Sequence, residues 1–334
     1  MSTRLVNWQA NRQANRQVLV HLASGVGNIV LATPLLIALS EMEFEVDVRL
    51  DADYPPTREL LESWSVVRAV GAVTPRPARD YGYVAPAVPP FYWHRFAREY
   101  SGLRNRVARP PDALFYTDEQ AFYLEFAHAL GYPRDRRPFY RLPIAPGERF
   151  GVSACTLAIA PGCKTGEMAA KRWPHFPELA ERFADVAIVG TRDDLPARPF
   201  PTHCRWFVDR LTLRQTAELL ASAGVAVGND SGLSHVAAAT GTPTVMIFGP
   251  TDHRVLGMLP PNVRVLRSGL VCEPCWTGAR LKACAGRVDC LAELSVDTVA
   301  REIFSSVVTG SALMRAASDS RTEPHIRTVP TADS

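Results

Sequence analysis

The stretch Gly228–Asp252, GNDSGLSHVAAATGTPTVMIFGPTD, holds the residues best suited to chemistry. An apolar strand is predicted to end at Gly228, and the sequence NDSG then leads into an alanine-rich helix. The first turn of a helix has unpaired N–H groups and the positive end of the helix dipole, so it can bind a phosphate. Asp230 and Ser231 are also ordinary residues for capping a helix, so the pattern alone leaves both interpretations open.

Two other predicted strand ends carry polar residues. Gly190 is followed by Thr-Arg and then by Asp193 and Asp194, and a carboxylate at this place in a nucleotide-binding fold can accept hydrogen bonds from ribose hydroxyls. Either aspartate could equally be an ordinary loop residue with no role in binding. The stretch PGCK, which begins at Pro161, is a second and weaker candidate for a phosphate loop.

Four of the seven cysteines follow the spacing C-x2-C-x8-C-x5-C. Four thiolates that include a close pair suit a tetrahedral metal site, so we predict a structural Zn²⁺ ion, or iron, in an irregular loop. The alternative is four free thiols, some of them buried. The four residues are Cys272, Cys275, Cys284 and Cys290.

Three segments together resemble glycosyltransferase family 9, the ADP-heptose–lipopolysaccharide heptosyltransferases. They are the Gly228–Asp252 stretch, the glycine loop GVGNIVLATPLL that begins at Gly25, and the sequence KRWP that begins at Lys171. The resemblance runs from about residue 17 to residue 306. It implies the GT-B architecture, with an acceptor-binding first domain, a second domain that binds a nucleotide-diphospho-sugar, and sugar transfer with inversion.

The resemblance also implies roles for the matching residues, with no metal or other cofactor in the chemistry. Asp230 would hydrogen-bond the donor sugar hydroxyls, and Lys171 would neutralise the departing diphosphate by electrostatic stabilisation. Without the resemblance, Lys171 would be read as a surface lysine. The diphosphate would be held by the helix start, with a histidine that could also be a simple helix-face residue: Ser231, Gly232, Leu233 and His235.

Position 28 departs from the family pattern. Family members have an aspartate there, the candidate general base, whereas this chain has Asn28, and an amide cannot accept a proton at neutral pH. Loss of a base typically costs about 10²–10⁴-fold in rate. Three explanations stay open: another base such as His21 or Asp51, an orienting role for Asn28 without a strong base, or a sugar-nucleotide-binding or scaffold protein with little activity.

The elements predicted around these residues alternate between strands and helices. Gln17–Ala23 reads as a buried strand that leads through the glycine loop into a helix over Asn28–Glu41, and Asp118–Gly131 reads as an amphipathic helix. After residue 150, predicted strands and helices continue to alternate. We therefore predict an α/β fold with two doubly wound, Rossmann-like domains that face a central cleft. The predicted limits are 17–150 and 151–310, with disordered ends at 1–16 and 311–334.

The region between residues 73 and 111 reads as loop-rich, because prolines, aromatic residues and arginines follow no clear period. We expect its part Tyr81–Arg109 to shape the acceptor pocket, since aromatic rings stack on sugars and arginine binds phosphate. This stretch contains an arginine cluster, Arg104, Arg106 and Arg109. The cluster could face an anionic substrate or an anionic lipid surface, or it could be part of a solvated loop.

Composition excludes several classes of protein. The chain has 334 residues, 47% hydrophobic and 21% charged, with a formal net charge of +3 and no long basic run, so we expect no nucleic-acid partner. The sequence has neither an apolar run of about 18 residues nor an apolar segment in its polar first 16 residues, so we expect a cytoplasmic protein. An NAD-linked oxidoreductase is disfavoured, because Val30 stands where G-x-G-x-x-G requires its third glycine.

Overall fold

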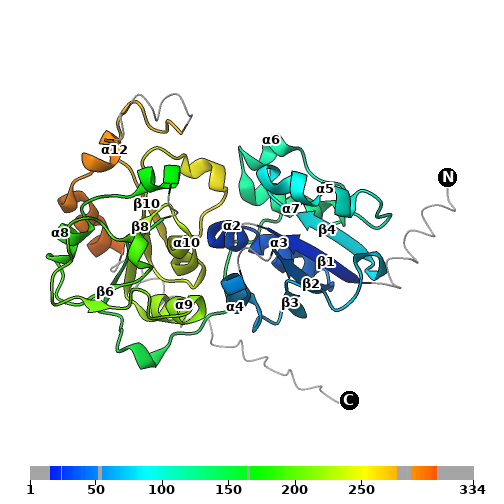
Figure 1. The fold of residues 1–334 in the computed structure, drawn as a ribbon, viewed down its shortest axis with the longest axis horizontal. Helices are drawn as coiled ribbons and strands as arrows, with labels where there is room; N and C mark the ends of the chain where they lie inside the picture. The colour runs from blue at the N-terminus through cyan, green and yellow to red at the C-terminus, as the bar shows by residue number, and fades with distance from the viewer. Residues whose placement is uncertain are drawn as a thin grey trace, which may run out of the picture.

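Two parallel β-sheets, each covered by helices, form the two halves of the chain (Figure 1). The structure is a computed structural model that describes residues 16–23, 25–51, 55–163, 166–276, 284 and 287–306. The predicted α/β fold with parallel sheets is confirmed, since every strand pair is parallel within the described residues. The two predicted disordered ends lie almost wholly outside the described residues, and the domain limits stay a prediction.

The N-terminal half contains a four-stranded sheet of order β3-β2-β1-β4. Its strands are β1 (Gln17–Leu22), β2 (Glu45–Leu50), β3 (Ala69–Gly71) and β4 (Tyr83–Ala87). Its α-helices are α2 (Val26–Leu31), α3 (Thr33–Glu41), α4 (Arg58–Leu61), α5 (Trp93–Tyr100), α6 (Asp112–Phe115) and α7 (Glu119–Ala129).

The central strand β1 explains why its sequence is apolar at almost every position. Val18 and Val20 pack into the main core with α3 and α7, while Leu19 points to the other face and packs with Phe96 and Tyr100. A strand covered on both faces has no solvent side, so the usual alternation of polar and apolar residues is lost.

Two expectations for this half are wrong in detail. The region 73–111 is not only loops, because it contains β4 and α5, which pack against β1. Pro86 hides the strand in the sequence, but proline is tolerated in β4 because this strand lies at the edge of the sheet. The predicted helix Asn28–Glu41 is divided into α2 and α3 at Ala32, with Pro34 in the first turn of α3.

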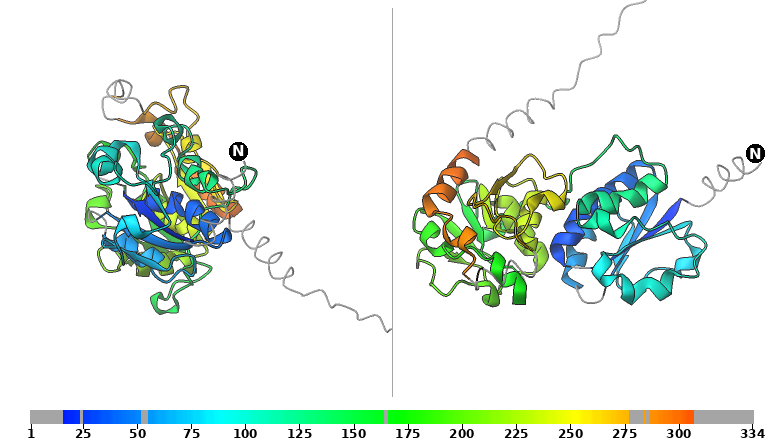
Figure 2. Two further views of the ribbon diagram at one scale, coloured as in Figure 1. Left: turned by 90° about the vertical axis from the view of Figure 1, so that its right-hand side faces the viewer. Right: turned by 90° about the horizontal axis from the view of Figure 1, so that it is seen from above.

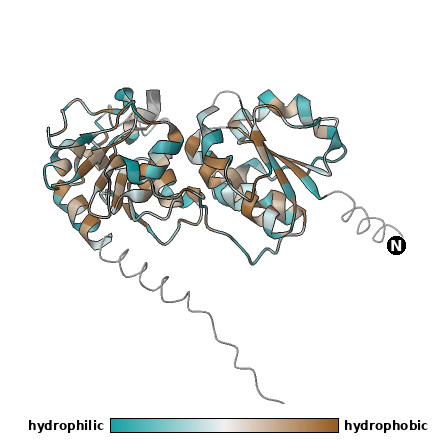
Figure 3. Ribbon diagram, turned by 90° about the horizontal axis from the view of Figure 1, so that it is seen from below, coloured by the Kyte–Doolittle hydropathy of each residue, from teal (hydrophilic) through white to brown (hydrophobic). Residues whose placement is uncertain are grey.

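The C-terminal half contains a six-stranded sheet whose order, β7-β6-β5-β8-β9-β10, matches the dinucleotide-binding order 3-2-1-4-5-6. Residues of β5 alternate between two cores, Ala158 and Ala160 on one face and Leu157 and Ile159 on the other. Figure 3 shows apolar residues concentrated along the strands and the inward sides of the helices. The strands are β5 (Leu157–Ala160), β6 (Val186–Ile188), β7 (Arg205–Trp206), β8 (Val225–Asn229), β9 (Thr244–Ile247) and β10 (Val263–Leu266). The α-helices are α8 (Phe176–Ala180), α9 (Leu213–Ser222), α10 (Gly232–Ala239), α12 (Asp289–Ala292) and a helical segment over 296–306.

The two halves touch where α2 and α10 face each other (Figures 1 and 2). A Cβ atom on Gly27 would lie 3.3 Å from the ring of His235, and one on Gly232 would lie 3.0 Å from Val26. Glycine at both positions lets the two helix starts approach closely. Within the described residues, no helix has the length and apolar character needed to cross a membrane.

A second contact joins α7 to the short helix η7 (His253–Leu256) of the other half. The buried side chain of Gln120 donates hydrogen bonds to the backbone carbonyls of Leu256 (2.7 Å) and Met258 (3.0 Å). Between them lies Gly257, whose φ of +90° is easily adopted only by glycine. This joint fixes the start of α7 against the C-terminal half.

Candidate active site

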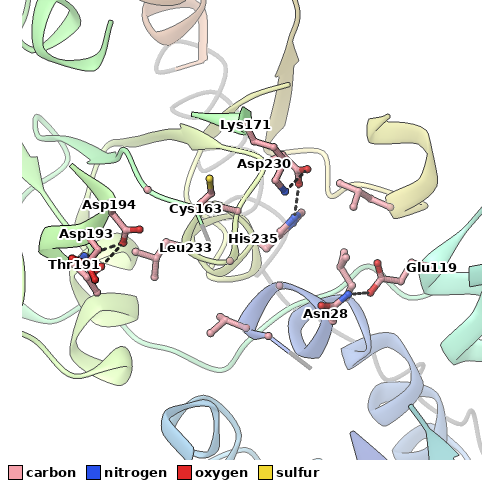
Figure 4. Close-up of a pocket in the computed structure, with 18 of the residues that line it drawn as sticks. Asn28, Glu119, Cys163, Lys171, Thr191, Asp193, Asp194, Asp230, Leu233 and His235 are labelled. Atoms are coloured by element: carbon pink, nitrogen blue, oxygen red, sulfur yellow. Dashed lines mark hydrogen bonds and ion pairs between the residues drawn. The ribbon is translucent and has the colours of Figure 1, made fainter. Parts of the chain in front are cut away.

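A cavity of about 640 Å³ lies between the two halves, and its walls follow the carboxyl ends of β1, β5, β6 and β8 (Figure 4). This is the edge at which open parallel sheets bind ligands, and the volume suits a small organic molecule. All eight predicted site residues outside the cysteine cluster line this cavity: Asn28, Lys171, Asp193, Asp230, Ser231, Gly232, Leu233 and His235. Their roles stay predictions.

The start of α10 offers free donors to this cavity. Ser231 is the N-cap residue, but its side chain makes no capping hydrogen bond, and the first turn of α10 contains no acidic residue. By contrast, helix α9 in the same half has a complete capping box formed by Thr212 and Gln215. The uncapped N–H groups of α10 are therefore available for an anion.

Asp230 stands at the centre of a polar network. Its Oδ2 accepts hydrogen bonds from Lys171 Nζ and Thr251 Oγ1, both at 2.9 Å, and His235 Nε2 lies 3.6 Å from Oδ1. Burial alone would raise the pKa of Asp230, but Lys171 and His235 outweigh it and hold this pKa well below its usual range. Asp230 is thus a permanent negative charge that fixes the Lys171 ammonium group at the cavity wall.

The other residues of the predicted KRWP motif anchor the backbone next to Lys171. Trp173 is buried, and its ring nitrogen donates to the carbonyl of Leu294 (3.0 Å). The amide side chain of Asn229 accepts from the Trp173 backbone (2.8 Å) and donates to the carbonyl of Pro161 (2.7 Å). Asn229 therefore ties the motif to the ends of β5 and β8, a role that its sequence position did not reveal.

The two aspartates that follow β6 have different contacts in the structure. Asp194 forms a capping box with Thr191 and lies 3.5 Å from Arg172, so it stabilises its own loop. Both aspartates line the cavity, but the carboxylate of Asp193 has no hydrogen-bond or ion-pair partner among the described residues. Asp193 rather than Asp194 is therefore the carboxylate available to a ligand.

Sequence reasoning missed Glu119, the first residue of α7. Asn28 Nδ2 donates to Glu119 Oε1 at 2.6 Å, and both residues line the cavity (Figure 4). Glutamate at a helix start is a common stabilising choice, so Glu119 carries no sequence signal of its own. Only the fold brings it next to Asn28, which lies 91 positions earlier.

Neither base suggested in place of Asn28 is well placed. His21 is completely buried within β1, its Nδ1 contacts Tyr100, and burial lowers its pKa to about 3. Asp51 lies 3.3 Å from the guanidinium of Arg95, and neither His21 nor Asp51 lines the cavity. From the aromatic stretch Tyr81–Arg109, only Phe91 lines it.

Comparison with known proteins finds a likeness to one family of enzymes. The model of glycosyltransferase family 9 (heptosyltransferase) matches residues 127–284. The matched residues make up just under half of the chain, and over them the chain is similar to glycosyltransferase family 9. Lipooligosaccharide heptosyltransferase 2 of Haemophilus influenzae is 32% identical to the chain over 126 residues, which span 33% of this chain and 36% of that relative.

Solved structures extend the family likeness to the whole fold. ADP-heptose LPS heptosyltransferase II of E. coli superposes with a TM-score of 0.66 at 21% identity, over 88% of this chain and 99% of that one. The iron-containing dodecameric glycosyltransferase TibC of enterotoxigenic E. coli superposes with a TM-score of 0.60 at 18% identity, over 88% and 77%. The chain therefore has the GT-B fold of these family 9 members.

The cysteine cluster lies apart from the cavity. Cys275 and Cys290 are buried, Cys284 is half-buried and Cys272 is exposed, and none of the four forms a disulfide. Across the part of the chain that the structure describes, no three His, Cys, Asp or Glu side chains are arranged to hold a metal ion. The geometry gives the predicted Zn²⁺ or iron site no support, so this site stays a prediction.

Proposed function

We propose that this protein is an inverting glycosyltransferase that takes a sugar from a nucleotide-diphospho-sugar, with ADP-heptose as the expected donor. The observation that carries the proposal is the Lys171–Asp230 ion pair beside the uncapped start of α10, inside the cleft between the two halves. A cation and a helix N-terminus that face one cavity suit a diphosphate. The likeness of residues 127–284 to family 9 supports the sugar and nucleotide classes.

The C-terminal wall supplies a partner for each part of the donor. The N–H groups of Ser231, Gly232 and Leu233 hold the diphosphate, and Asp193 accepts from the ribose hydroxyls. Lys171 stabilises the negative charge that develops on the leaving diphosphate, so the proposed chemistry requires no metal ion. Asp230 positions Lys171 and accepts hydrogen bonds from the sugar.

The acceptor is proposed as a lipopolysaccharide core or another surface glycan, glycolipid or glycoprotein. The N-terminal wall of the cavity, with Phe91, Phe115 and Leu31, offers apolar and aromatic surface that suits sugar rings. With such an acceptor, the protein would work in the cytoplasm, in peripheral contact with the inner membrane. No nucleic-acid partner is proposed.

Calorimetric titration with ADP-, GDP- and UDP-linked sugars tests the donor site. We expect tight binding of ADP-heptose, and about 10- to 100-fold weaker binding after Lys171→Ala, since a charged hydrogen bond contributes about 1.5–3 kcal/mol. The control is Arg198→Ala, which removes an exposed cation of the same half that pairs with Glu181. Thermal unfolding of each variant shows whether it is folded. If the unmodified protein bound none of these nucleotide sugars, the transferase proposal would be ruled out.

The second candidate function is a sugar-nucleotide-binding or scaffold protein of low activity. It is favoured by one observation, the amide at position 28 where the family has a carboxylate. The variant Asn28→Asp discriminates between the two candidates. A large gain in turnover supports a degenerate site, whereas a loss supports a working role for the Asn28 amide.

A structural Zn²⁺ or iron ion held by the four cysteines is retained as a separate proposal. The proposal rests on the C-x2-C-x8-C-x5-C spacing of the four cysteines. Metal analysis of the purified protein and of a Cys275→Ser variant is the test. A metal-free unmodified protein would contradict the proposal.

A further inference from the structure

A carboxylate lies directly against the amide side chain of Asn28 at the wall of the cavity. The Asn28 amide donates to Glu119, which comes from a different element and reaches the same cavity. We propose that Glu119 is the general base of this enzyme and that Asn28 orients it. This inference rests on the proposed glycosyltransferase function.

The two oxygens of Glu119 have different surroundings. Oε1 accepts from Asn28 Nδ2 (2.6 Å) and from Tyr123 OH (3.2 Å), which together fix the plane of the carboxylate. Oε2 accepts no hydrogen bond from any described residue, yet it is not among the wholly buried atoms that lack a partner. Oε2 is therefore the oxygen that is open to the cavity and able to take a proton.

The electrostatic setting suits a base that works near neutral pH. Burial, the largest cause, raises the pKa of Glu119 to about 7, and the negative charges of Asp230 and Asp118 add to the rise. The hydrogen bonds from Asn28 and Tyr123 act in the opposite direction. Other charges around these groups are already paired, Asp118 with Arg137 and Asp230 with Lys171.

The position of Glu119 depends on both halves of the chain. Its neighbour Asp118 caps α7 by accepting from the Ala121 backbone and binds Arg137, and its other neighbour Gln120 binds the carbonyls of Leu256 and Met258. Glu119 therefore lies between two anchored residues. Such support is what a base needs to keep its oxygen aimed at a substrate.

The proposed step balances without a further reactant. An acceptor hydroxyl oxygen forms a bond to the anomeric carbon while the bond from that carbon to the diphosphate oxygen breaks. The bonding electrons leave with the nucleoside diphosphate, whose charge Lys171 stabilises, and the hydroxyl proton passes to Glu119 Oε2. A water molecule can replace the acceptor, which gives slow hydrolysis of the donor.

Hydrolysis of ADP-heptose, followed by ADP release, tests the role of Glu119 without a known acceptor. We expect Glu119→Gln to lower the rate at pH 8 by at least about 100-fold, the lower end of what a general base contributes. Binding of ADP-heptose should change less than threefold, because glutamine still accepts from Asn28. The control is Glu125→Gln on the same helix, whose glutamate pairs with Arg134 outside the cavity.

The pH profile separates a catalytic role from a structural one. In the unmodified protein, we expect the rate to fall about tenfold per pH unit below pH 7, as Glu119 gains its proton, and Glu119→Gln should abolish this dependence. The double variant Asn28→Asp/Glu119→Gln returns a carboxylate to the loop. It should recover at least tenfold over Glu119→Gln, a rescue that a damaged fold cannot give.

The outcomes distinguish this inference from the proposed function. Binding and hydrolysis that survive Glu119→Gln within threefold, with the pH dependence intact, would overturn the inference alone. Absence of ADP-heptose binding, or binding without any hydrolysis, in the unmodified protein would overturn the transferase proposal and the inference together. Loss of activity on Glu119→Gln with equal loss of donor binding would also count against Glu119 as the base.

Discussion

The two walls of the cleft are built in different ways. On the C-terminal wall, most charged residues already have partners, as in the pairs Lys171–Asp230 and Arg172–Asp194, and Asp193 is the exception. On the N-terminal wall, most lining residues are apolar, and Glu119 is the one carboxylate that this wall contributes among the described residues. One wall thus holds fixed charge, which suits a charged ligand. The other holds an isolated carboxyl group, which suits transfer of a proton.

The largest expected effect is a loss of stability when Asp230 is removed from the charged C-terminal wall. Asp230→Ala leaves the mostly buried Lys171 side chain, 14% exposed, without its partner, and we expect the free energy of unfolding at pH 7 to fall by up to about 3 kcal/mol. Urea unfolding measures this change. The stabilising effect of Asp230 is fully present above its unfolded pKa of 3.8 and is lost as the pH falls through the lowered folded pKa, so the difference should shrink in acid.

The matched control for this prediction is Glu181→Ala. Glu181 pairs with Arg198 on the surface, where both side chains are about half exposed. We expect a cost below about 1 kcal/mol. Equal costs for the two variants would show that the Lys171–Asp230 pair has no special place in the fold.

The second prediction concerns Glu119 on the apolar wall, where the dependence of stability on pH has the opposite sign to that of Asp230. The rise in the pKa of Glu119 from 4.5 to about 7 means that its carboxyl group contributes stability below pH 4.5 that is lost as the pH rises through 7. Glutamine does not titrate. The difference in free energy of unfolding between Glu119→Gln and the unmodified protein should therefore shift by about 3 kcal/mol in favour of the variant between pH 4 and pH 8. Urea unfolding at both pH values measures it, and a pH-independent difference would contradict the burial argument.

A third change acts where the two walls are joined. Gly257 has a φ of +90°, and an added Cβ would overlap Arg137 and crowd Gln120 at 3.0 Å. We expect Gly257→Ala to lower stability by about 1–3 kcal/mol and to reduce hydrolysis of ADP-heptose more than its binding. The control is Gly102→Ala, because an added Cβ there meets no atom within 4 Å. Equal losses in binding and hydrolysis would indicate that the joint does not position Glu119.

The smallest effect separates two adjacent aspartates. Asp193→Asn should weaken binding of ADP by about 3- to 10-fold with no change in melting temperature, since its carboxylate has no structural partner. Asp194→Asn should instead cost about 1 kcal/mol of stability, because it disrupts the cap shared with Thr191. Calorimetry and thermal unfolding of the pair decide the assignment, and a reversed pattern would exchange the two roles.

The C-terminal wall could be predicted from sequence because its residues are close together along the chain. A single segment carries Asp230, Ser231 and His235, and the fold of one strand and one helix brings them to the cavity. The strand ends that carry Asp193 and the glycine loop were likewise visible as changes from apolar to polar residues. Local patterns therefore sufficed for positions that depend on one strand–helix unit.

The N-terminal wall could not be predicted in the same way. Glu119 and Asn28 meet only because α7 packs on α3, which places the start of α7 beside the glycine loop. No local pattern records such packing. Strand β4 was missed for a related reason, since its proline and its aromatic neighbours obscure a strand that is defined by its contact with β1.

The buried Gln120 side chain also affects how the cleft can open. A separation of the two halves at η7 would break both of its hydrogen bonds, to Leu256 and Met258, and would move the adjacent Glu119 away from Lys171 and Asp230. Opening of the cleft would thus separate the carboxyl group of Glu119 from the charged residues of the C-terminal wall, while its bonds to Asn28 and Tyr123 stay within the N-terminal half. If the proposed function holds, a donor bound to such an open form would have no base beside it, and its hydrolysis would be slow until the two halves closed.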